Sequence, residues 1–292
     1  MFEKLDSVYL LDTAALGFRR AVACYLVKDV KTAILDTGYA SSLDNVYSKL
    51  QELGVQRLDY IIPTHVHLDH CGGVAGLAKL YPEAEVLAHP QAVKHLVSPD
   101  KLIESVKKIY GPEIMKLFGD VEPVQEDRVR PVADGEVLGL GRCELTFIYT
   151  PGHAPHQISI FESSSQSVVT ADAVPAQYPD FPAIIPTTPP PSFDLDQYIN
   201  SMRKLGGLGA RFFLTPHYGP TDPSGERVRR MVERTVMWVE AFRDEMDAGK
   251  VIQRLRKTLE EEAGRPIPAY ADNLIRISAL GILRYLGRRQ LF

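Results

Sequence analysis

The chain has few cysteines for its length, and their positions do not suggest cross-links. There are three, Cys24, Cys71 and Cys143, among 292 residues. Their number and spacing give no disulfide framework, and Cys24 lies in an apolar stretch where it would act as a small buried side chain. Stability must therefore come from a packed core, and a hydrophobic content of 45% is enough to build one.

Long apolar runs and an excess of positive charge are also missing. No apolar segment approaches the roughly 18–20 residues that cross a bilayer, so we expect no membrane association. The 33 lysines and arginines are outnumbered by 37 aspartates and glutamates, which gives no indication of nucleic-acid binding. Residues 1–6 lack the basic and apolar regions of a signal peptide. We therefore expect a cytoplasmic protein that acts on a small molecule.

The chain is rich in potential metal ligands within one short segment. Residues 64–70 read THVHLDH and directly follow an apolar stretch, residues 60–63. Neutral imidazoles and carboxylates are the side chains that hold zinc and similar divalent ions. Because polar groups gathered in a small volume each need a partner, a bound cation would supply one that they share. A single histidine after a strand is usually a hydrogen-bonded core or surface residue, but this density favours a metal site.

Three later residues extend this set of ligands. His153, Asp172 and His217 each stand at the C-terminal end of a stretch with the short, apolar character of a strand. The carboxyl edge of a sheet is where strands present residues to a crevice. A hydrolytic metal site needs enough ligands to fix the ion and an open position for water, and these three residues could complete it.

The order of these motifs resembles that of the metallo-β-lactamase fold superfamily of hydrolases. The pattern His-x-His-x-Asp-His is followed by Pro-Gly-His at 151–153, by Ala-Asp-Ala at 171–173 and by a late histidine. Residues 36–38, Asp-Thr-Gly, are similar to the early Asp-x-Gly motif of that superfamily. The resemblance covers about residues 1–220. It implies an α/β fold, a four-layer αβ/βα sandwich, whereas periodicity alone gives only mixed α and β.

The resemblance also implies two divalent cations and a ligand set for each. His65, His67 and His153 would hold the first ion, Asp69, His70 and His217 the second, and Asp172 would bridge the two. Zinc suits this imidazole-rich set, and iron and manganese are alternatives. The lactamase branch often has cysteine at the bridging position, so this chain looks more like the glyoxalase II and lactonase branches. The flavin-associated di-iron branch carries acidic substitutions in its first motif, which residues 64–70 lack.

We therefore expect a dinuclear metal-dependent hydrolase. A metal-bridging hydroxide would attack a small ester-like substrate, such as a lactone, a thioester or a phosphoester. Asp69 is the candidate for accepting a proton as well as for holding metal. Asp36 is expected to orient an imidazole ligand from behind, with a turn residue that bonds local backbone amides as the alternative. Hydrolysis of β-lactams, as a main or a side activity, and a non-catalytic or redox metal protein on the same fold remain open.

A proline-rich segment, residues 175–192, follows the bridging aspartate closely. Its density of proline argues against a helix or an interior strand, so we expect a loop. We favour a loop beside the metals over a stiff surface connector, because long ordered loops are often functional. Tyr178 and Phe181 would then line a substrate pocket, as would Tyr218, the residue after the late histidine. Lactonases of the superfamily place a tyrosine where this chain has Pro175, which weakens an assignment to quorum lactones.

The C-terminal part of the chain is predicted to be helical. Apolar residues at helical spacing predict helices over 227–246, 251–263 and 274–286. We therefore expect a catalytic domain, residues 1–221, and a helical extension packed on it, residues 222–292. The last helix is basic, with Arg276, Arg284, Arg288 and Arg289. A solvated face is preferred over a lid or dimer contact that binds an anionic substrate tail, and a homodimer is one option for the assembly.

Overall fold

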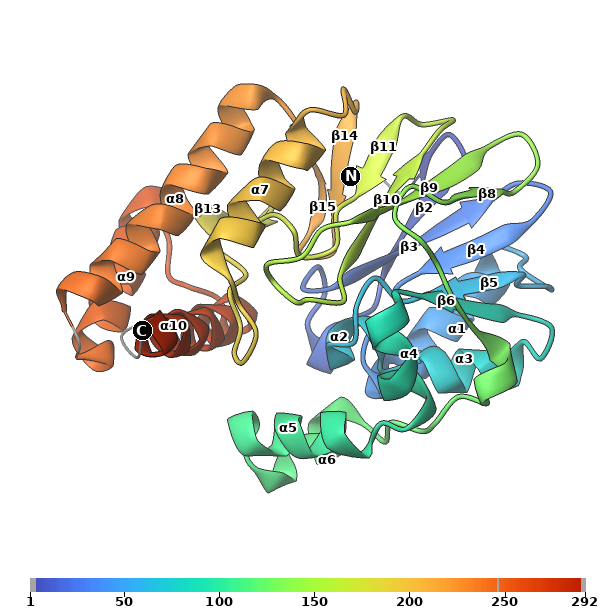
Figure 1. Ribbon diagram of the computed structural model, residues 1–292, viewed down its shortest axis with the longest axis horizontal. Coiled ribbons are helices and arrows are strands. Elements are labelled where there is room, and N and C mark those ends of the chain that lie inside the picture. The colour runs from blue at the N-terminus through green and yellow to red at the C-terminus, as the bar shows by residue number, and fades with distance from the viewer. Residues whose placement is uncertain (1–3, 246, 290–292) are drawn as a thin grey trace.

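Two β-sheets packed face to face form the centre of the fold. The computed structural model describes residues 4–245 and 247–289 (Figure 1). The first sheet runs in chain order: β1 (Lys4–Leu5), β2 (Val8–Asp12), β3 (Ala23–Lys28), β4 (Thr32–Leu35), β5 (Tyr60–Ile62), β6 (Glu85–Ala88) and β7 (Val129–Pro131). The second has the order β15 (Gly219–Thr221), β14 (Phe212–Thr215), β11 (Ser167–Val169), β10 (Ile158–Glu162), β9 (Glu144–Tyr149) and β8 (Val137–Gly139).

Central strands of both sheets are buried on two faces, which explains their apolar sequences. In β4, Ala33 and Leu35 belong to the core between the sheets, whereas Ile34 packs in the core on the outer face. In β9, Phe147 lies between the sheets and Ile148 lies on the outer side. Successive side chains of a strand point to opposite faces, so alternate residues build each core.

Helices cover the outer face of the first sheet: α1 (Leu43–Glu52), α3 (Val74–Leu80) and α4 (Pro90–Val97), with the short α2 (Leu68–Cys71) beside them. In α1, Val46 and Leu50 lie about one turn apart, and both are fully buried against this sheet. The helices that the sequence predicts over 41–53 and 73–80 are confirmed. α4 is not among the predicted helices, although Ala92 and Leu96 lie at helical spacing and Pro90 stands at its first position.

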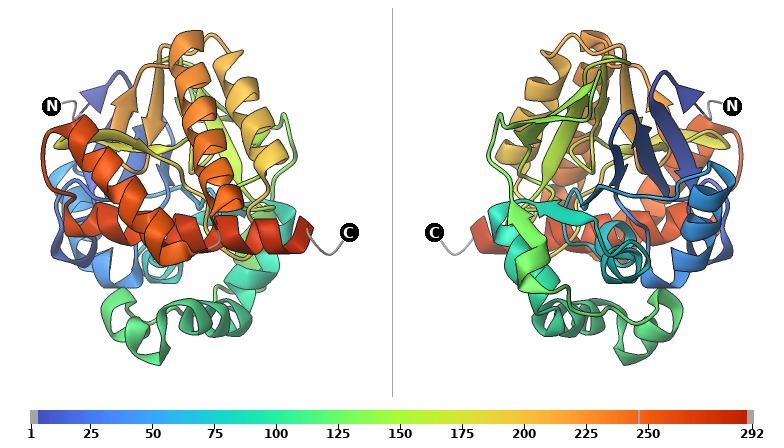
Figure 2. Two further views of the ribbon diagram at one scale, coloured as in Figure 1. Left: turned by 90° about the vertical axis from the view of Figure 1, so that its left-hand side faces the viewer. Right: turned by 90° about the vertical axis from the view of Figure 1, so that its right-hand side faces the viewer.

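Four helices lie on the outer side of the second sheet: α7 (Leu195–Gly206), α8 (Gly225–Asp244), α9 (Ala248–Ala263) and α10 (Ala269–Arg289) (Figure 2). Of these, α9 and α10 pack on α8 and on each other. Trp238 of α8 is fully buried in one core with Val168 and Phe213 of the sheet. The four-layer αβ/βα sandwich with C-terminal helices is therefore confirmed. The boundary between residues 221 and 222 stays a prediction. None of the described helices combines the length and the apolar character needed to cross a bilayer.

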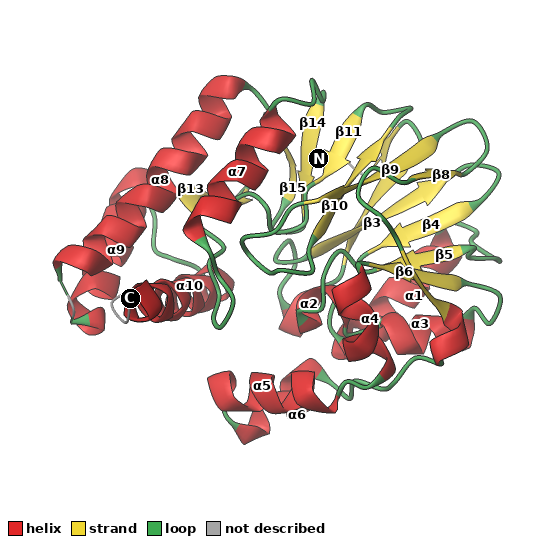
Figure 3. Cartoon of the chain, in the orientation of Figure 1, coloured by secondary structure: helices red, strands yellow, loops and turns green. Residues whose placement is uncertain are grey.

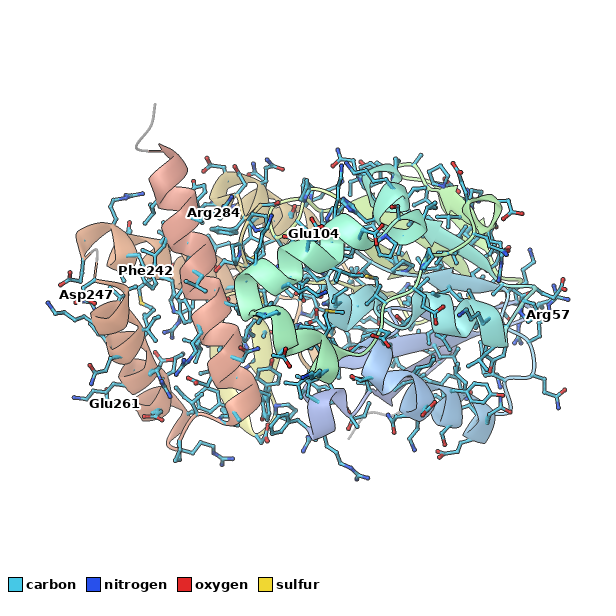
Figure 4. The ribbon with its side chains drawn as sticks, turned by 90° about the horizontal axis from the view of Figure 1, so that it is seen from below. Arg57, Glu104, Phe242, Asp247, Glu261 and Arg284 are labelled. Carbon is cyan, nitrogen blue, oxygen red and sulfur yellow. The ribbon has the colours of Figure 1, made fainter. Side chains whose placement is uncertain are left out.

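A separate helical segment lies below the first sheet in Figure 1. The sequence predicts a mainly helical stretch over 102–118, and the structure has α5 (Asp100–Tyr110), a 3₁₀ turn (Pro112–Ile114) and α6 (Met115–Phe118). The break falls at Gly111, whose φ of 93° favours glycine. No residue of α5 is fully buried. Figure 4 shows α5, marked by Glu104, on the same side of the molecule as α10, marked by Arg284.

The proline-rich segment forms a hairpin, which corrects the expectation of a loop without strands. β12 (Ala176–Tyr178) pairs antiparallel with β13 (Phe181–Ile185). Pro182 is exposed on this two-stranded ribbon, while its neighbours Phe181 and Ala183 are buried. A ribbon of two strands has free edges, where a residue without a backbone N–H is tolerated. The proline content thus excludes an interior strand but permits an edge strand, which is where Pro182 lies.

Candidate metal centre

Four strand ends bring the expected ligands to one edge of the two sheets. β5 of the first sheet leads into residues 64–70, while β9, β11 and β14 of the second sheet lead to His153, Asp172 and His217 (Figure 3). β11 and β14 are parallel, and β9 is parallel to β11 because both pair antiparallel with β10. The carboxyl ends of these three strands therefore meet at one edge, where side chains from distant parts of the chain can converge.

His153 reaches this edge because a glycine precedes it. Gly152 has a φ of 129°, and a Cβ atom built there would lie 2.2 Å from the backbone nitrogen of Tyr198. The first turn of α7 thus packs directly on the backbone of this loop. Any other residue at 152 would force the helix or the loop to move, which explains the Pro-Gly-His sequence in physical terms.

The expected ligands form one group, called the His/Asp cluster below: His65, His67, Asp69, His70, His153, Asp172 and His217. Three triplets have ligand atoms within 4.8 Å of one another: His65, His67 and His153; His65, His70 and Asp172; Asp69, His70 and His217. The first and last are the two ligand sets that the resemblance implies. Asp172 lies between them, since its oxygens are 3.3 Å from His153 Nε2 and 3.5 Å from His217 Nε2.

The donor atoms and their spacing fit divalent cations. Ligand atoms of a tetrahedral zinc site lie ~3.3 Å apart when the bonds are about 2.0–2.1 Å long. The carboxylate oxygens lie 3.3–3.6 Å from the imidazole nitrogens that face them. In addition, the Nε2 of His70 is buried without a hydrogen bond, which is unfavourable unless another partner approaches. The cluster therefore supports metal binding, and its nitrogen and oxygen donors suit zinc, iron or manganese.

Opposite charges shift the pKa values in one half of the cluster, which consists of Asp69, His70, Asp172 and His217. Burial lowers the pKa of a histidine, but at His70 and His217 the neighbouring carboxylates outweigh burial and raise the pKa, to about 10 for His217. Burial raises the pKa of Asp69 and of Asp172, but the same histidines outweigh it and lower both values. This half therefore carries negative charge that requires a positive partner, either protons on its imidazoles or cations.

The other half of the cluster favours neutral imidazole. Burial lowers the pKa of His65, of His67 and of His153, and the neighbouring imidazoles lower it further. His67 Nδ1 lies 2.9 Å from His65 Nε2 and 2.8 Å from His153 Nε2. Neutral imidazole is the form that coordinates a metal, so these three nitrogens are prepared for one ion.

Asp36 lies behind the cluster, at the back of His70. Its Oδ2 is 2.8 Å from His70 Nδ1. Its Oδ1 accepts a hydrogen bond from the backbone N–H of Thr64 at 2.7 Å, and Oδ2 accepts one from the Thr64 hydroxyl at 3.1 Å. A carboxylate at Nδ1 fixes the tautomer of the ring and directs Nε2 toward the cluster. Asp36 therefore lies where an orienting partner of His70 is expected, and it also holds the loop that carries the first histidines. The alternative of a turn residue that bonds local amides does not apply, because Thr64 is 28 residues away in the sequence.

Two further histidines are held by backbone carbonyls. The Nδ1 of His153 donates to the carbonyl of Thr187 at 2.9 Å, and the Nδ1 of His217 donates to that of Ala21 at 3.2 Å. Each bond leaves Nε2 free to face the cluster. The sequence gives no signal for these partners, because every residue has a carbonyl. Thr187 lies in the proline-rich segment, so that segment does support the site.

The cluster opens into a cavity of about 560 Å³, within the range of about 300–1,000 Å³ that holds small ligands. Tyr178 lines this cavity, and its ring centroid is 6.5 Å from that of His217. Tyr218 lines a neighbouring hollow beside Arg227 instead. Phe181 is fully buried in the core and lines neither space. Of the three aromatic residues that the sequence proposes for a pocket, Tyr178 alone reaches the cavity.

Much of the remaining cavity wall was not predicted from the sequence. It includes residues of α5 and α6, of the segment around Phe18, and of α10. Two arginines of α10 are not part of this wall: Arg276 donates to Asp272 at 3.2 Å, and Arg284 is exposed. These two support a solvated face, while the side chains of Arg288 and Arg289 lie outside the described residues.

Comparison with known proteins agrees with this geometry. Residues 17–217 match the family model of the metallo-beta-lactamase superfamily. The chain is 31% identical over 236 residues to a metallo-beta-lactamase fold-containing protein, ST1585, of Sulfurisphaera tokodaii, which covers 78% of this chain and 84% of that protein. The solved structure of ST1585 from Sulfolobus tokodaii matches with a TM-score of 0.74 at 26% identity, over 97% of this chain and 98% of that one.

Narrower matches reach proteins of different chemistry. A coenzyme F420H(2) oxidase of Methanothermobacter marburgensis is 32% identical over 132 residues, 44% of this chain and 28% of that protein. An atrochrysone carboxyl ACP thioesterase of Aspergillus fumigatus is 24% identical over 178 residues, 61% of this chain and 44% of that protein. An oxidase and a thioesterase are both similar to this chain, so similarity alone does not define the reaction.

Proposed function

The chain belongs to the metallo-beta-lactamase superfamily, and on this premise we propose that it is a metal-dependent hydrolase of a small ester-like bond. Lactones, thioesters and phosphoesters are the candidate substrates. The observation that carries the proposal is the His/Asp cluster, in which five imidazoles and two carboxylates meet at the base of a cavity. Aspartate rather than cysteine at position 172 favours these bonds over β-lactams.

The proposal assigns the donors of the cluster to two ions. His65, His67 and His153 would hold one, Asp69, His70 and His217 the other, and Asp172 would contact both. Divalent cations bound there would make water more acidic near neutral pH and would polarise a carbonyl or phosphoryl oxygen. We propose zinc for both positions, with iron and manganese as the alternatives that metal analysis would reveal.

Asp69 is the carboxylate that we propose for proton transfer. Its side chain is 21% exposed and lines the cavity, whereas that of Asp172 is 6% exposed. Its Oδ2 is 3.4 Å from His217 Nε2 and 3.5 Å from His70 Nε2, so its position is fixed. Asp69 would accept the proton of the attacking water while the new bond to oxygen forms, and would return it to the leaving atom as the old bond breaks.

Tyr178 is the candidate donor for the oxygen that gains negative charge. It lines the cavity within ring contact of His217. Burial raises the pKa of its hydroxyl, and the charge of Asp172 raises it further, so the hydroxyl keeps its proton. A fixed O–H donor aimed at a developing oxyanion lowers the barrier of acyl transfer. Tyr218, the other tyrosine considered, does not line the cavity.

The proposal is tested by metal analysis and a substrate panel on the same preparation. The untreated protein is analysed for metals, then chelated and reconstituted separately with zinc, manganese and iron. Each form is assayed on lactones, thioesters, phosphodiesters and β-lactams. Turnover of an ester-like substrate that chelation abolishes and one metal restores would support the proposal. Turnover of β-lactams alone, or metal-dependent oxygen reduction without hydrolysis, would replace it, and no metal-dependent turnover would refute it.

A further inference from the structure

The cavity changes in polarity between the His/Asp cluster and its outer part. Outside the cluster, the described residues that line it include one permanently charged side chain, Lys101. Two histidines, His95 and His156, also line it, and their ring centroids lie 6.0 Å apart. A substrate part with several negative charges would find a single cation here. The outer cavity is therefore built for an uncharged group.

Two helices that are distant in the sequence form facing apolar walls. Apolar and aromatic residues at helical spacing line the cavity from both: Leu102, Val106 and Ile109 from α5, and Tyr270, Leu274 and Ile277 from α10. Residues at these intervals lie on one face of a helix. Ser105 of α5 and Asn273 of α10 also line it, with Lys101. This part of the cavity, called the slot below, is mainly apolar, which suits a flexible hydrocarbon chain better than a compact polar group.

The rim of the slot leaves apolar surface uncovered. Leu117 is 60% exposed and Phe18 is 40% exposed, and both line the cavity. No residue of α5 is fully buried, although its apolar stripe faces the space. Single exposed apolar residues are common, but several around one opening mark a binding surface. An apolar ligand would remove this surface from water.

The inner end of the cavity is polar and would fix the direction of such a ligand. The hydroxyl-bearing side chains Tyr39, Tyr110 and Tyr178 line the space beside the cluster. The ring of Tyr178 lies 6.5 Å from that of His217 and 4.7 Å from that of Tyr270 of α10, centroid to centroid. The His/Asp cluster and the apolar residues of α10 therefore border one continuous space. A substrate with a polar reacting bond and an apolar tail matches this arrangement.

We propose that the slot between α5 and α10 binds an uncharged acyl chain of medium length and directs its ester-like bond toward the His/Asp cluster. This inference rests on the proposed hydrolase function and adds the substrate class. It predicts that chain length, rather than the leaving group, controls specificity. Transfer of a methylene group from water to an apolar site is worth about 0.8 kcal/mol, so kcat/KM should rise about fourfold per methylene until the slot is full.

The first test uses a homologous series with one leaving group, from acetyl to dodecanoyl thioesters of N-acetylcysteamine. The metal-reconstituted full chain is assayed on each, and kcat/KM is plotted against chain length. A rise over several methylenes followed by a plateau or a fall supports the slot. A flat profile, or a preference for acetyl, overturns the inference even if hydrolysis is efficient.

A matched pair of variants locates the effect. Ser105→Trp places a large ring on the face of α5 that lines the cavity, and Lys108→Trp places the same ring on an exposed position of α5 outside the lining. Ser105→Trp should lower kcat/KM for the decanoyl substrate at least tenfold more than for the acetyl substrate. Lys108→Trp should keep the ratio of kcat/KM for the decanoyl substrate to kcat/KM for the acetyl substrate found in the unmodified protein. If this ratio is the same in the two variants, the acyl chain does not lie against α5.

A binding measurement separates this inference from the proposed reaction. Decanoate and butyrate are titrated into the untreated protein, and into Leu274→Gln and Leu280→Gln, by calorimetry. Decanoate should bind at least tenfold more tightly than butyrate, and only Leu274→Gln should reduce that difference, because Leu280 does not line the cavity. If every ester is inert but this preference holds, the hydrolase proposal fails and the slot stands. If hydrolysis occurs without the preference, the slot fails.

Discussion

Replacing Asp36 by Asn should weaken metal binding without unfolding the protein. Asp36 is buried, and its Oδ2 lies 2.8 Å from His70 Nδ1. Asparagine keeps an oxygen that can accept the bond from the Thr64 N–H, and it tolerates the φ of 63° found here. What it loses is the charged acceptor behind the imidazole. The substitution therefore isolates the contact with His70 from the support of the loop.

The size of this effect can be worked out in two ways. A hydrogen bond to a charged group contributes about 1.5–3 kcal/mol, which corresponds to about 10- to 140-fold in an equilibrium constant. Loss of an outer partner of a metal-bound histidine likewise costs about 10- to 100-fold in metal affinity or activity. We expect the affinity for the ion held by His70 to fall in this range, and the other ion to be retained more strongly.

The assay is competition of the reconstituted protein with a chromogenic chelator, together with the number of ions per chain after dialysis. Asp59→Asn is the matched control, because Asp59 accepts a hydrogen bond from Thr32 N–H at 2.8 Å in the same sheet but lies outside the cluster. The control should bind metal like the unmodified protein. Two ions bound with unchanged affinity in Asp36→Asn would refute the role of Asp36 as an orienting partner.

Three further outcomes are expected. Asp172→Ala should lower metal content and activity together, and two tightly bound ions in that variant would contradict the bridging role. In chelated protein, the raised pKa of His217, about 10 against 6.5 in a free side chain, stabilises the fold below pH 6.5, and this stabilisation is lost as the pH rises toward 10. Thermal melts should show that fall in chelated but not in zinc-loaded protein. Trp238→Ala should cost about 3–5 kcal/mol in chemical unfolding, because the ring is fully buried, whereas Met237→Ala, 39% exposed, should stay within about 0.5 kcal/mol.

The sequence predicted that the expected ligands come together, because each follows a strand. His153, Asp172 and His217 stand at the ends of short apolar runs, and the rule that parallel strands present their carboxyl ends together places them at one edge. The helical layer over the first sheet could also be predicted in part, because the apolar residues of α1 and α3 have clear helical spacing. The resemblance to a family supplied what periodicity could not, which is the stacking of two sheets.

The cavity was harder to predict because its walls depend on long-range packing. Nothing in the sequence of α5 shows that it faces α10, more than a hundred residues later. Tyr178 and Phe181 are direct partners across one hairpin and pack in the same core, yet only Tyr178 also lines the cavity. The proline-rich sequence gives no sign of this difference. The bond between His153 Nδ1 and the carbonyl of Thr187 could not be predicted either, because every residue has a carbonyl.

The position of α10 has a consequence for how this protein could change its preferences. This helix contributes no residue to the His/Asp cluster, yet five of its residues line the cavity: Ala269, Tyr270, Asn273, Leu274 and Ile277. Under the proposed function, the residues of α10 that contact the substrate and the residues of the His/Asp cluster that carry the reaction lie on separate parts of the chain. Substitutions on the inward side of α10 can alter which molecules are admitted while the chemistry at the strand ends is preserved.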